Sequence, residues 1–150
     1  MIALIQRVSQ ASLSIEGHLF SSIKRGFLVL LGIHESDTEK DIEYLSNKII
    51  GLRIFSDEDG KMNLSLKQIQ GEILLVSQFT LNAQTRKGNR PSFIEAAKPE
   101  IAIPLYEKMI ESLEENFQKK IQTGKFGADM KINLVNDGPV TIILNSKDGN

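Results

Sequence analysis

Apolar and polar residues partly alternate over residues 2–15, which is the two-residue period of a strand with one buried face. Glu16 and Gly17 then form a turn, and residues 19–23 predict the returning strand of a hairpin. An unbroken apolar run over residues 27–33 is typical of a strand that is buried on both faces. The chain therefore begins with three predicted strands, of which the first two are paired.

Two later segments have the spacing of amphipathic helices. Ser36 and Glu39 form a capping-box pattern, and the apolar residues after it predict a helix that ends near Ile54. A second helix is predicted over about residues 99–117, and Pro104 must lie in its first turn or kink it. The apolar faces consist of Ile42, Leu45, Ile49 and Leu52 in the first helix and Leu105, Met109, Leu113 and Phe117 in the second.

The remaining segments read as strands and loops. Residues 72–79 predict another buried strand, and a polar loop then leads to residues 91–93 and a short helical piece. Two closing strands, over residues 131–135 and 140–144, flank a Gly-Pro pair. The polar tail of residues 145–150 is expected to fray.

The order of these elements predicts an α/β fold in a single domain that spans residues 1–150. We expect mixed β-sheets in a sandwich- or barrel-like arrangement, with two main helices on one side. A chain of 150 residues is long enough to bury a core, and its 41% apolar and 25% charged residues are ordinary globular usage.

Composition and charge narrow the classes of function. The chain has no cysteine, which excludes disulfides and thiolate nucleophiles and suits a reducing compartment. It has no apolar stretch long enough for a membrane span and no signal-peptide pattern, so we expect a soluble cytoplasmic protein with no membrane partner. The net charge of -1 argues against a broad nucleic-acid binder, and we expect no DNA partner. An enzyme that grips one end of an RNA through a local basic loop is still compatible with that charge.

Histidine is scarce, with only His18 and His34 present. His34 lies near Glu35 and Asp37, where a metal or acid–base role is conceivable, but a solvated loop is the preferred interpretation. The acidic segment 56–60 departs from the calcium-loop pattern and predicts a turn. We therefore expect no metal site, and a hydrolase with this composition is poorly equipped for a Ser-His-Asp relay.

The segment Ser77-Gln78-Phe79-Thr80 sets small polar side chains and backbone amides where a strand run opens into a loop. Ser77 and Thr80 are candidate nucleophiles, but neither has a base nearby in sequence. Gln78 and the backbone N–H groups are instead suited to binding an oxyanion, which needs only fixed donors. A strand end with local hydrogen bonds is the simpler alternative.

Two further segments carry candidate binding chemistry. Arg86, Lys87 and Arg90 lie in a loop that ends at Phe93, so the loop is suited to meeting phosphates and stacking a base. Residues 136–139 place Asp-Gly, a favoured hairpin turn, before a proline. Each pattern alone is equally compatible with an ordinary loop or turn.

The joint occurrence of these patterns is more specific. The chain resembles the D-aminoacyl-tRNA deacylase family from end to end, except for its last few residues. Gln84 departs from the family pattern, since many relatives carry Asp there. The resemblance rests on QRV at 6–8, SQFTL at 77–81, GNRPSF at 88–93, TGKFGADM at 123–130 and LVNDGPVT at 134–141.

This resemblance implies an enzyme that hydrolyses the ester between a D-amino acid and the terminal adenosine of tRNA. It implies a homodimer in which a cis Gly138-Pro139 pair enters the partner's pocket, gathers the α-ammonium group and excludes an L side chain. Arg7 would prop this pair and Met130 would form a pocket wall.

By the same resemblance Ser77, Gln78, Phe79 and Thr80 line the acyl and adenosine site, and no cofactor is required. Attack is assisted either by Thr80 or by the ribose 2′-hydroxyl of the substrate, and the scarcity of histidine favours the hydroxyl. Glycine mischarged on tRNA is a further candidate substrate. The alternatives are a non-catalytic module that binds the tRNA acceptor end and a general esterase with a Ser77 or Thr80 nucleophile.

Overall fold

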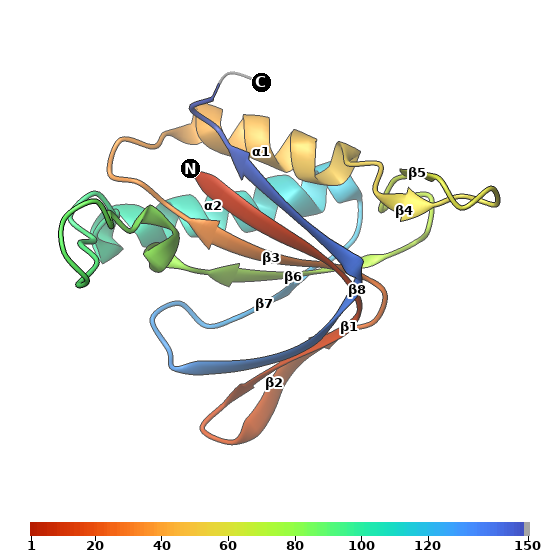
Figure 1. Ribbon diagram of the computed structural model, residues 1–150, viewed down its shortest axis with the longest axis horizontal. Coiled ribbons are helices and arrows are strands. Elements are labelled where there is room, and N and C mark those ends of the chain that lie inside the picture. Colours follow the sequence, from red (N-terminus) through yellow and green to blue (C-terminus); the bar gives the residue numbers. More distant parts are fainter. Residues whose placement is uncertain (149–150) are drawn as a thin grey trace.

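The computed structural model describes residues 1–148, which form one curved sheet, a small hairpin and two long helices (Figure 1). The predicted mixed α/β domain with two helices is confirmed, and its sheet is barrel-like and nearly closed. The elements are β1 (Ile2–Ile15), β2 (His18–Ile23), β3 (Gly26–Gly32), α1 (Glu39–Gly51), β4 (Phe55–Ser56), β5 (Met62–Leu64), β6 (Glu72–Ser77), the 3-10 helix η1 (Phe79–Asn82), α2 (Pro99–Phe117), β7 (Gln122–Thr123) and β8 (Met130–Asn145).

The long strand β1 organises the sheet, whose strand order is β2-β1-β3-β6-β7. The first half of β1 pairs with β3 and its second half with β2, while β8 pairs antiparallel along almost its whole length. β3 and β6 are parallel, because α1 and the β4–β5 hairpin provide the crossover between them. Because β2 and β3 pair with different halves of the bent strand β1, the sheet curls toward a barrel, as Figure 1 shows.

Both helices cover the same face of the sheet (Figure 1). They contact each other through Ser46 and Ser112, whose hydroxyl oxygens lie 2.7 Å apart. Beneath them lies the larger core, which includes Ile5, Phe27 and Met109, all fully buried. A second, smaller apolar cluster fills the curled half of the sheet. Among the described residues, neither helix is long and apolar enough to cross a membrane.

The start and end of α1 differ from the prediction. Its N-cap is Thr38, whose backbone N–H donates to Asp41 Oδ2 at 2.8 Å. The predicted Ser36–Glu39 pair is wrong, because the Ser36 backbone N–H donates to His34 Nδ1 instead, at 3.1 Å. The helix also ends at Gly51, three residues before Ile54, and extended backbone at residue 52 leads the chain into the β4–β5 hairpin.

Other local features of the fold can also be compared with expectation. β6 ends at Ser77, and the only short helical piece between β6 and α2 is η1, directly after that strand rather than after residue 93. Of the two alternatives expected for Pro104, the first turn is excluded, because this residue lies farther inside α2. The tail is held through residue 148: the Ser146 backbone N–H donates to the Met1 carbonyl at 2.9 Å, and Lys147 pairs with Asp41 at the same separation. The last two residues of the expected frayed tail, 149–150, lie outside the described residues.

The two predicted closing strands are one strand, β8, with a bulge at the Gly-Pro pair. Gln6 of β1 pairs with Thr141, and Val8 pairs with Asn136. Arg7 alone therefore faces the four residues 137–140. The extra residues of β8 have no partner in the ladder and form a bulge. β8 bends sharply partway along its length in Figure 1.

Candidate active site

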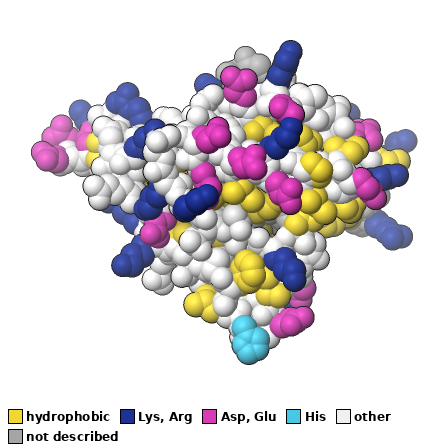
Figure 2. All heavy atoms as spheres, turned by 180° about the vertical axis from the view of Figure 1, so that it is seen from behind, with side chains coloured by type: hydrophobic (Ala, Val, Ile, Leu, Met, Phe, Trp, Pro, Cys, Tyr) yellow, Lys and Arg dark blue, Asp and Glu magenta, His cyan; other side chains and the backbone are white. Residues whose placement is uncertain are grey.

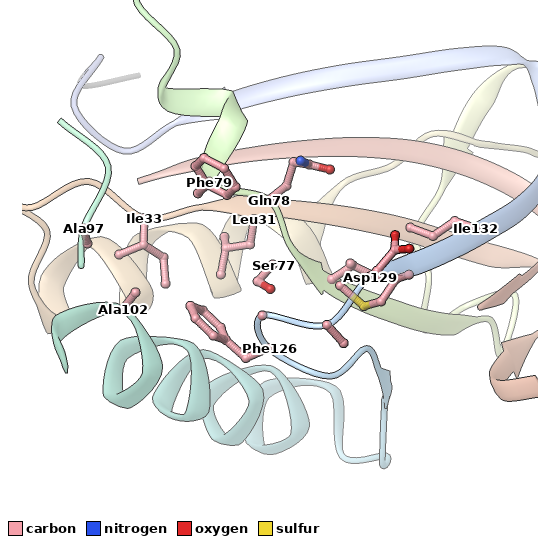
Figure 3. A pocket seen from close by; sticks show the side chains of 14 residues that line it. Leu31, Ile33, Ser77, Gln78, Phe79, Ala97, Ala102, Phe126, Asp129 and Ile132 are labelled. Carbon is pink, nitrogen blue, oxygen red and sulfur yellow. The ribbon is translucent and has the colours of Figure 1, made fainter. Parts of the chain in front are cut away.

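A cavity of about 330 Å³ opens beside the carboxyl ends of β3 and β6. Side chains from β3, β6, α2 and the segment before β8 converge on this space in Figure 3. Most of them are apolar, and the polar ones gather near the end of β6. The lining residues are Leu31, Ile33, Val76, Ser77, Gln78, Phe79, Ala97, Ala102, Phe126, Gly127, Ala128, Asp129, Met130 and Ile132.

The end of β6 brings the first three predicted catalytic residues to this cavity. The Gln78 backbone N–H donates to the Leu31 carbonyl at 2.7 Å, which continues the pairing with β3 one residue beyond Ser77. η1 then packs closely on Gly32, where a Cβ atom would lie 2.8 Å from Leu81 Cβ. Gly32 thus leaves room for η1, a supporting role that the sequence analysis missed although Gly32 interrupts the apolar run over residues 27–33.

Thr80 is placed differently from its three neighbours. It is exposed and does not line the cavity. Its hydroxyl accepts a hydrogen bond from Gln78 Nε2 at 2.6 Å. Within residues 1–148, the backbone N–H groups of Phe79 and Thr80 donate to no protein acceptor. These are the first two amides of a 3-10 helix, which are open to a ligand because no preceding turn supplies their acceptors.

The wall opposite β6 comes from the segment that precedes β8. Met130, the first residue of β8, lines the cavity with it and packs against Gly124, where a Cβ would lie 2.6 Å from the Met130 sulfur. Phe126 also lines the cavity and lies against Tyr106, with ring centroids 5.9 Å apart. Burial raises the pKa of Tyr106 well above its ordinary value, so its hydroxyl stays protonated and donates to the Leu75 carbonyl at 2.9 Å. Phe126 is therefore a lining residue held by the α2 side of the core.

Asp129 is a second lining residue to which no role was predicted. Figure 3 shows its carboxylate between Ser77 and Ile132. Its side chain pairs with Lys131, whose Nζ lies 2.7 Å from Oδ1, and both side chains are exposed. An exposed pair of this kind contributes little to stability. In the sequence, only its position next to Met130, in the motif at 123–130, could have indicated that Asp129 lies at the site.

The Gly-Pro pair lies on the bulge of β8 and outside this chain's own cavity. The Gly138–Pro139 peptide bond is cis, as predicted, and both residues are exposed. Gly138 has a φ of +137°, and a Cβ there would lie 2.8 Å from Val140 Cγ2 and 2.9 Å from Arg7 Nη2. The arginine is nearly buried, at 9% exposure, and Nε donates to the Asp137 carbonyl at 2.8 Å. The structure thus places Arg7 directly against the pair that it was expected to prop.

The cationic loop follows η1, whose first residue, Phe79, lines the cavity. Paired backbone hydrogen bonds between Gln84 and Ser92, at 2.8 and 3.0 Å, close the loop that carries Arg86, Lys87 and Arg90. Beyond this closure Phe93 packs edge-on against Phe79, with ring centroids 5.1 Å apart. In the described part of the chain none of the three cations forms an ion pair.

Neither histidine lies at the cavity. His34 Nε2 lies 3.6 Å from Glu95 Oε2, in a bridge between the end of β3 and the segment before α2, and His18 is exposed. Over residues 1–148, the His, Asp and Glu side chains form no group of three that is suited to a metal ion. Among the described residues, the lining of this cavity therefore contains no imidazole.

Comparison with known proteins identifies the family. The family described as D-Tyr-tRNA(Tyr) deacylase matches residues 4–145. A D-aminoacyl-tRNA deacylase of Flavobacterium johnsoniae is 59% identical over 148 residues, with 99% of each chain covered. Another, of Cytophaga hutchinsonii, is 62% identical over 148 residues with the same coverage.

Two solved structures share this fold. A protein named c-Myc DNA Unwinding Element Binding Protein has a TM-score of 0.92 at 46% identity, covering 97% of this chain and 98% of its own. A probable eukaryotic D-amino acid tRNA deacylase has a TM-score of 0.83 at 15% identity, covering 95% and 97%, and supports the fold alone. The chain belongs to the D-Tyr-tRNA(Tyr) deacylase family.

Proposed function

We propose that this chain is a D-aminoacyl-tRNA deacylase, which hydrolyses the ester between a D-amino acid and the terminal adenosine of tRNA. Family membership over residues 4–145 is the observation that carries the proposal. Water attacks the ester carbonyl carbon, the bond to the ribose oxygen breaks, and that oxygen leaves with a proton. The products are a free D-amino acid and tRNA, and glycine mischarged on tRNA is a further substrate.

The cavity beside β6 receives the ester. The backbone N–H of Phe79, a residue that lines the cavity, supplies a donor for the oxyanion that develops on the carbonyl. Gln78 holds the Thr80 hydroxyl through a 2.6 Å hydrogen bond, so this hydroxyl positions the loop instead of attacking. With no histidine in the lining, the substrate's own 2′-hydroxyl assists the attacking water.

Selection of the D-amino acid requires a second copy of the chain. Gly138 and Pro139 are exposed on the β8 bulge and do not line the cavity of their own chain. In a homodimer the pair from one protomer enters the cavity of the other, where its carbonyl oxygens accept hydrogen bonds from the α-ammonium group. Met130 forms the neighbouring wall. Backbone atoms suit this task because their position is independent of the substrate's side chain.

The cationic loop supplies contacts to the tRNA acceptor end. Arg86, Lys87 and Arg90 are exposed near the Phe79–Phe93 pair, which places positive charge and an aromatic platform at the rim. The face drawn in Figure 2 carries acidic and basic side chains interspersed. We propose that binding is local to the acceptor end, and we propose no DNA partner for this chain.

A single comparison tests the activity. Substoichiometric protein is mixed with D-Tyr-tRNA or L-Tyr-tRNA, and release of tyrosine is followed over many turnovers. Repeated turnover of the D-substrate with little release from the L-substrate supports the proposal. Binding without turnover would indicate the non-catalytic acceptor-end module instead, and equal hydrolysis of both substrates together with small esters would indicate a general esterase.

A further inference from the structure

Arg7 is held from two directions by backbone carbonyl groups. Its Nε donates to the Asp137 carbonyl at 2.8 Å, and its Nη1 donates to the Ile54 carbonyl at 2.6 Å. Within residues 1–148 the guanidinium pairs with no carboxylate. The orientation of Arg7, and with it the support of the β8 bulge, therefore depends on where the carbonyl of Ile54 lies.

The Ile54 carbonyl is fixed by the residue that follows it. Phe55 is fully buried and stacks on Phe27, with ring centroids 5.0 Å apart and ring planes 16° from parallel. The Arg25 guanidinium lies 5.3 Å from the Phe55 ring centroid, over its face. This stack pins the start of the β4–β5 hairpin against β3.

The stack is also next to Arg7. Phe27 is the residue of β3 that pairs directly with Arg7 of β1. A closed path of contacts thus runs from Arg7 to the Ile54 carbonyl, through Phe55 to Phe27, and back across the ladder to Arg7. A buried aromatic pair of this kind resists displacement because the interior around it is close-packed.

We propose that Phe55, through its stack on Phe27, is a positioning residue for the Gly138-Pro139 pair and thereby for the choice between D- and L-substrates. This inference rests on the proposed role of that pair in chiral selection. If Phe55 is replaced by an aliphatic residue, the Ile54 carbonyl is free to shift and Arg7 loses one of its two acceptors. Arg7 lies very close to Gly138, since a Cβ at that residue would be only 2.9 Å from Arg7 Nη2. A shift of the guanidinium therefore removes the support of Gly138.

A matched substitution separates this role from ordinary core packing. Phe117 is also a buried phenylalanine of the main core, at 6% exposure, but it ends α2 and takes no part in the path described above. Phe55→Leu and Phe117→Leu remove the same atoms from the same core. Both are expected to lower the melting temperature. Phe55→Met, whose flexible side chain adapts better to an irregular gap but also lacks a ring, replaces Phe55→Leu if that variant does not fold.

The first measurement does not depend on activity. Hydrogen exchange of the Arg7 Nε–H is followed by nitrogen-15 NMR in wild type and both variants. We expect exchange to be at least about tenfold faster in Phe55→Leu, because the Nη1 bond to the Ile54 carbonyl no longer holds the guanidinium against the Asp137 carbonyl, and a loss of about 1.4 kcal/mol corresponds to that factor. Phe117→Leu should leave the rate near the wild-type value. Equal rates in the two variants would overturn the inference.

The second measurement is the ratio of D-Tyr-tRNA to L-Tyr-tRNA hydrolysis. Phe55→Leu should lower this ratio about tenfold, while Phe117→Leu should reduce both rates together and leave the ratio unchanged. If Gly138→Ala changes the ratio and Phe55→Leu does not, the positioning role of Phe55 alone is overturned. A ratio that Gly138→Ala also leaves unchanged would instead reject the proposed chiral role of the pair, and the NMR measurement would then decide whether Phe55 still positions Arg7.

Discussion

Arg7 Nε donates a hydrogen bond to the carbonyl oxygen of Asp137 at 2.8 Å, across a separation of 130 residues. This bond ties the first strand to the bulge of the last one, immediately before Gly138. Arg7 alone faces the four residues of that bulge, where ladder hydrogen bonds are lacking, and it supplies one side-chain hydrogen bond to them. The placement of the Gly-Pro pair is therefore a tertiary property of β1, β4 and β8 together.

Gly138→Ala should lower D-aminoacyl-tRNA hydrolysis. Its Cβ would lie 2.8 Å from Val140 Cγ2 and 2.9 Å from Arg7 Nη2, and the φ of +137° disfavours any side chain. A strain of about 1–3 kcal/mol corresponds to a rate loss of about ten- to hundredfold if it falls on the reacting geometry. Steady-state hydrolysis of D-Tyr-tRNA measures this loss.

Gly17→Ala is the matched control for this substitution. Gly17 also has a positive φ, of +79°, but a Cβ there meets no atom within 4 Å, and the residue lies in the β1–β2 turn. It should lower stability slightly and leave the rate unchanged. An equal rate loss in both alanine variants would mean that strain in general, and not crowding at Arg7, is responsible.

Mixed dimers should reveal whether the Gly-Pro pair acts on the partner's cavity. Ala128→Trp fills the cavity of its own chain, and Gly138→Ala disables the pair of its own chain. Each variant alone should be nearly inactive. A heterodimer of the two should recover about half of the wild-type activity, because one intact cavity receives one intact pair. No recovery, or an active monomer in sedimentation at assay concentration, would contradict the dimer mechanism.

Ser77→Ala and Thr80→Ala should each retain substantial activity. No histidine lines the cavity to act as a base for either hydroxyl, and the Thr80 hydroxyl accepts a hydrogen bond from Gln78 Nε2 at 2.6 Å. Removing the 2′-hydroxyl of the substrate should cause a much larger loss, since general acid–base assistance contributes about 10²–10⁴-fold. Abolished turnover in Thr80→Ala, with an unchanged circular dichroism spectrum, would favour a covalent mechanism instead.

Replacing Arg86 and Lys87 by serine should weaken tRNA binding and reduce its salt dependence. Each lost contact to a single-stranded phosphate lowers the slope of log K against log salt by about 0.7. Hydrolysis of a minimal aminoacyl-adenosine should barely change, because it lacks those phosphates. Serine at Lys40 and Lys48, two exposed lysines of α1, is the control and should leave the slope unaltered.

The pH dependence of stability should report on Asp41. Burial by itself raises the pKa of this carboxyl, but hydrogen bonds from Ser146, Lys147 and Thr38 outweigh it and hold the pKa well below its ordinary value. Because the folded-state pKa is lowered, the stabilisation is complete above about pH 4 and is lost as the pH falls further. Asp41→Asn should therefore lower the free energy of unfolding by about 1–3 kcal/mol at neutral pH.

Urea unfolding at several pH values measures this difference. The gap between wild type and Asp41→Asn should shrink below about pH 4, where the Asp41 carboxylate of the unfolded chain becomes protonated while that of the folded protein still resists protonation. Glu58→Gln makes the same chemical change in the exposed turn of the β4–β5 hairpin and should have no such effect. A gap that does not vary with pH would show that Asp41 acts through packing alone.

Local patterns in the sequence predicted most of the elements. The apolar run at 27–33 and the helical spacing over 99–117 identified β3 and α2, because burial imposes the period of a strand or a helix on the chain. Turn chemistry at Glu16-Gly17 identified the first hairpin. Element boundaries were less predictable: both Ser36 and Thr38 are able to cap α1, and the contact of Ser36 with His34 leaves that role to Thr38.

The cavity was decided by tertiary structure. Ser77 and Met130 were predicted as site residues, but Phe126, Asp129 and Gly32 gain their roles only from the packing of β3, β6 and the segment before β8. Nothing local in the sequence indicates that Phe55 lies on Phe27, or that the Ile54 carbonyl meets Arg7. The sequence by itself determined the periodic elements and the motifs, since these depend on neighbours along the chain. The tertiary structure decided which of them meet, since hydrogen bonds and packing across the sheet join residues whose separation in sequence carries no local signal.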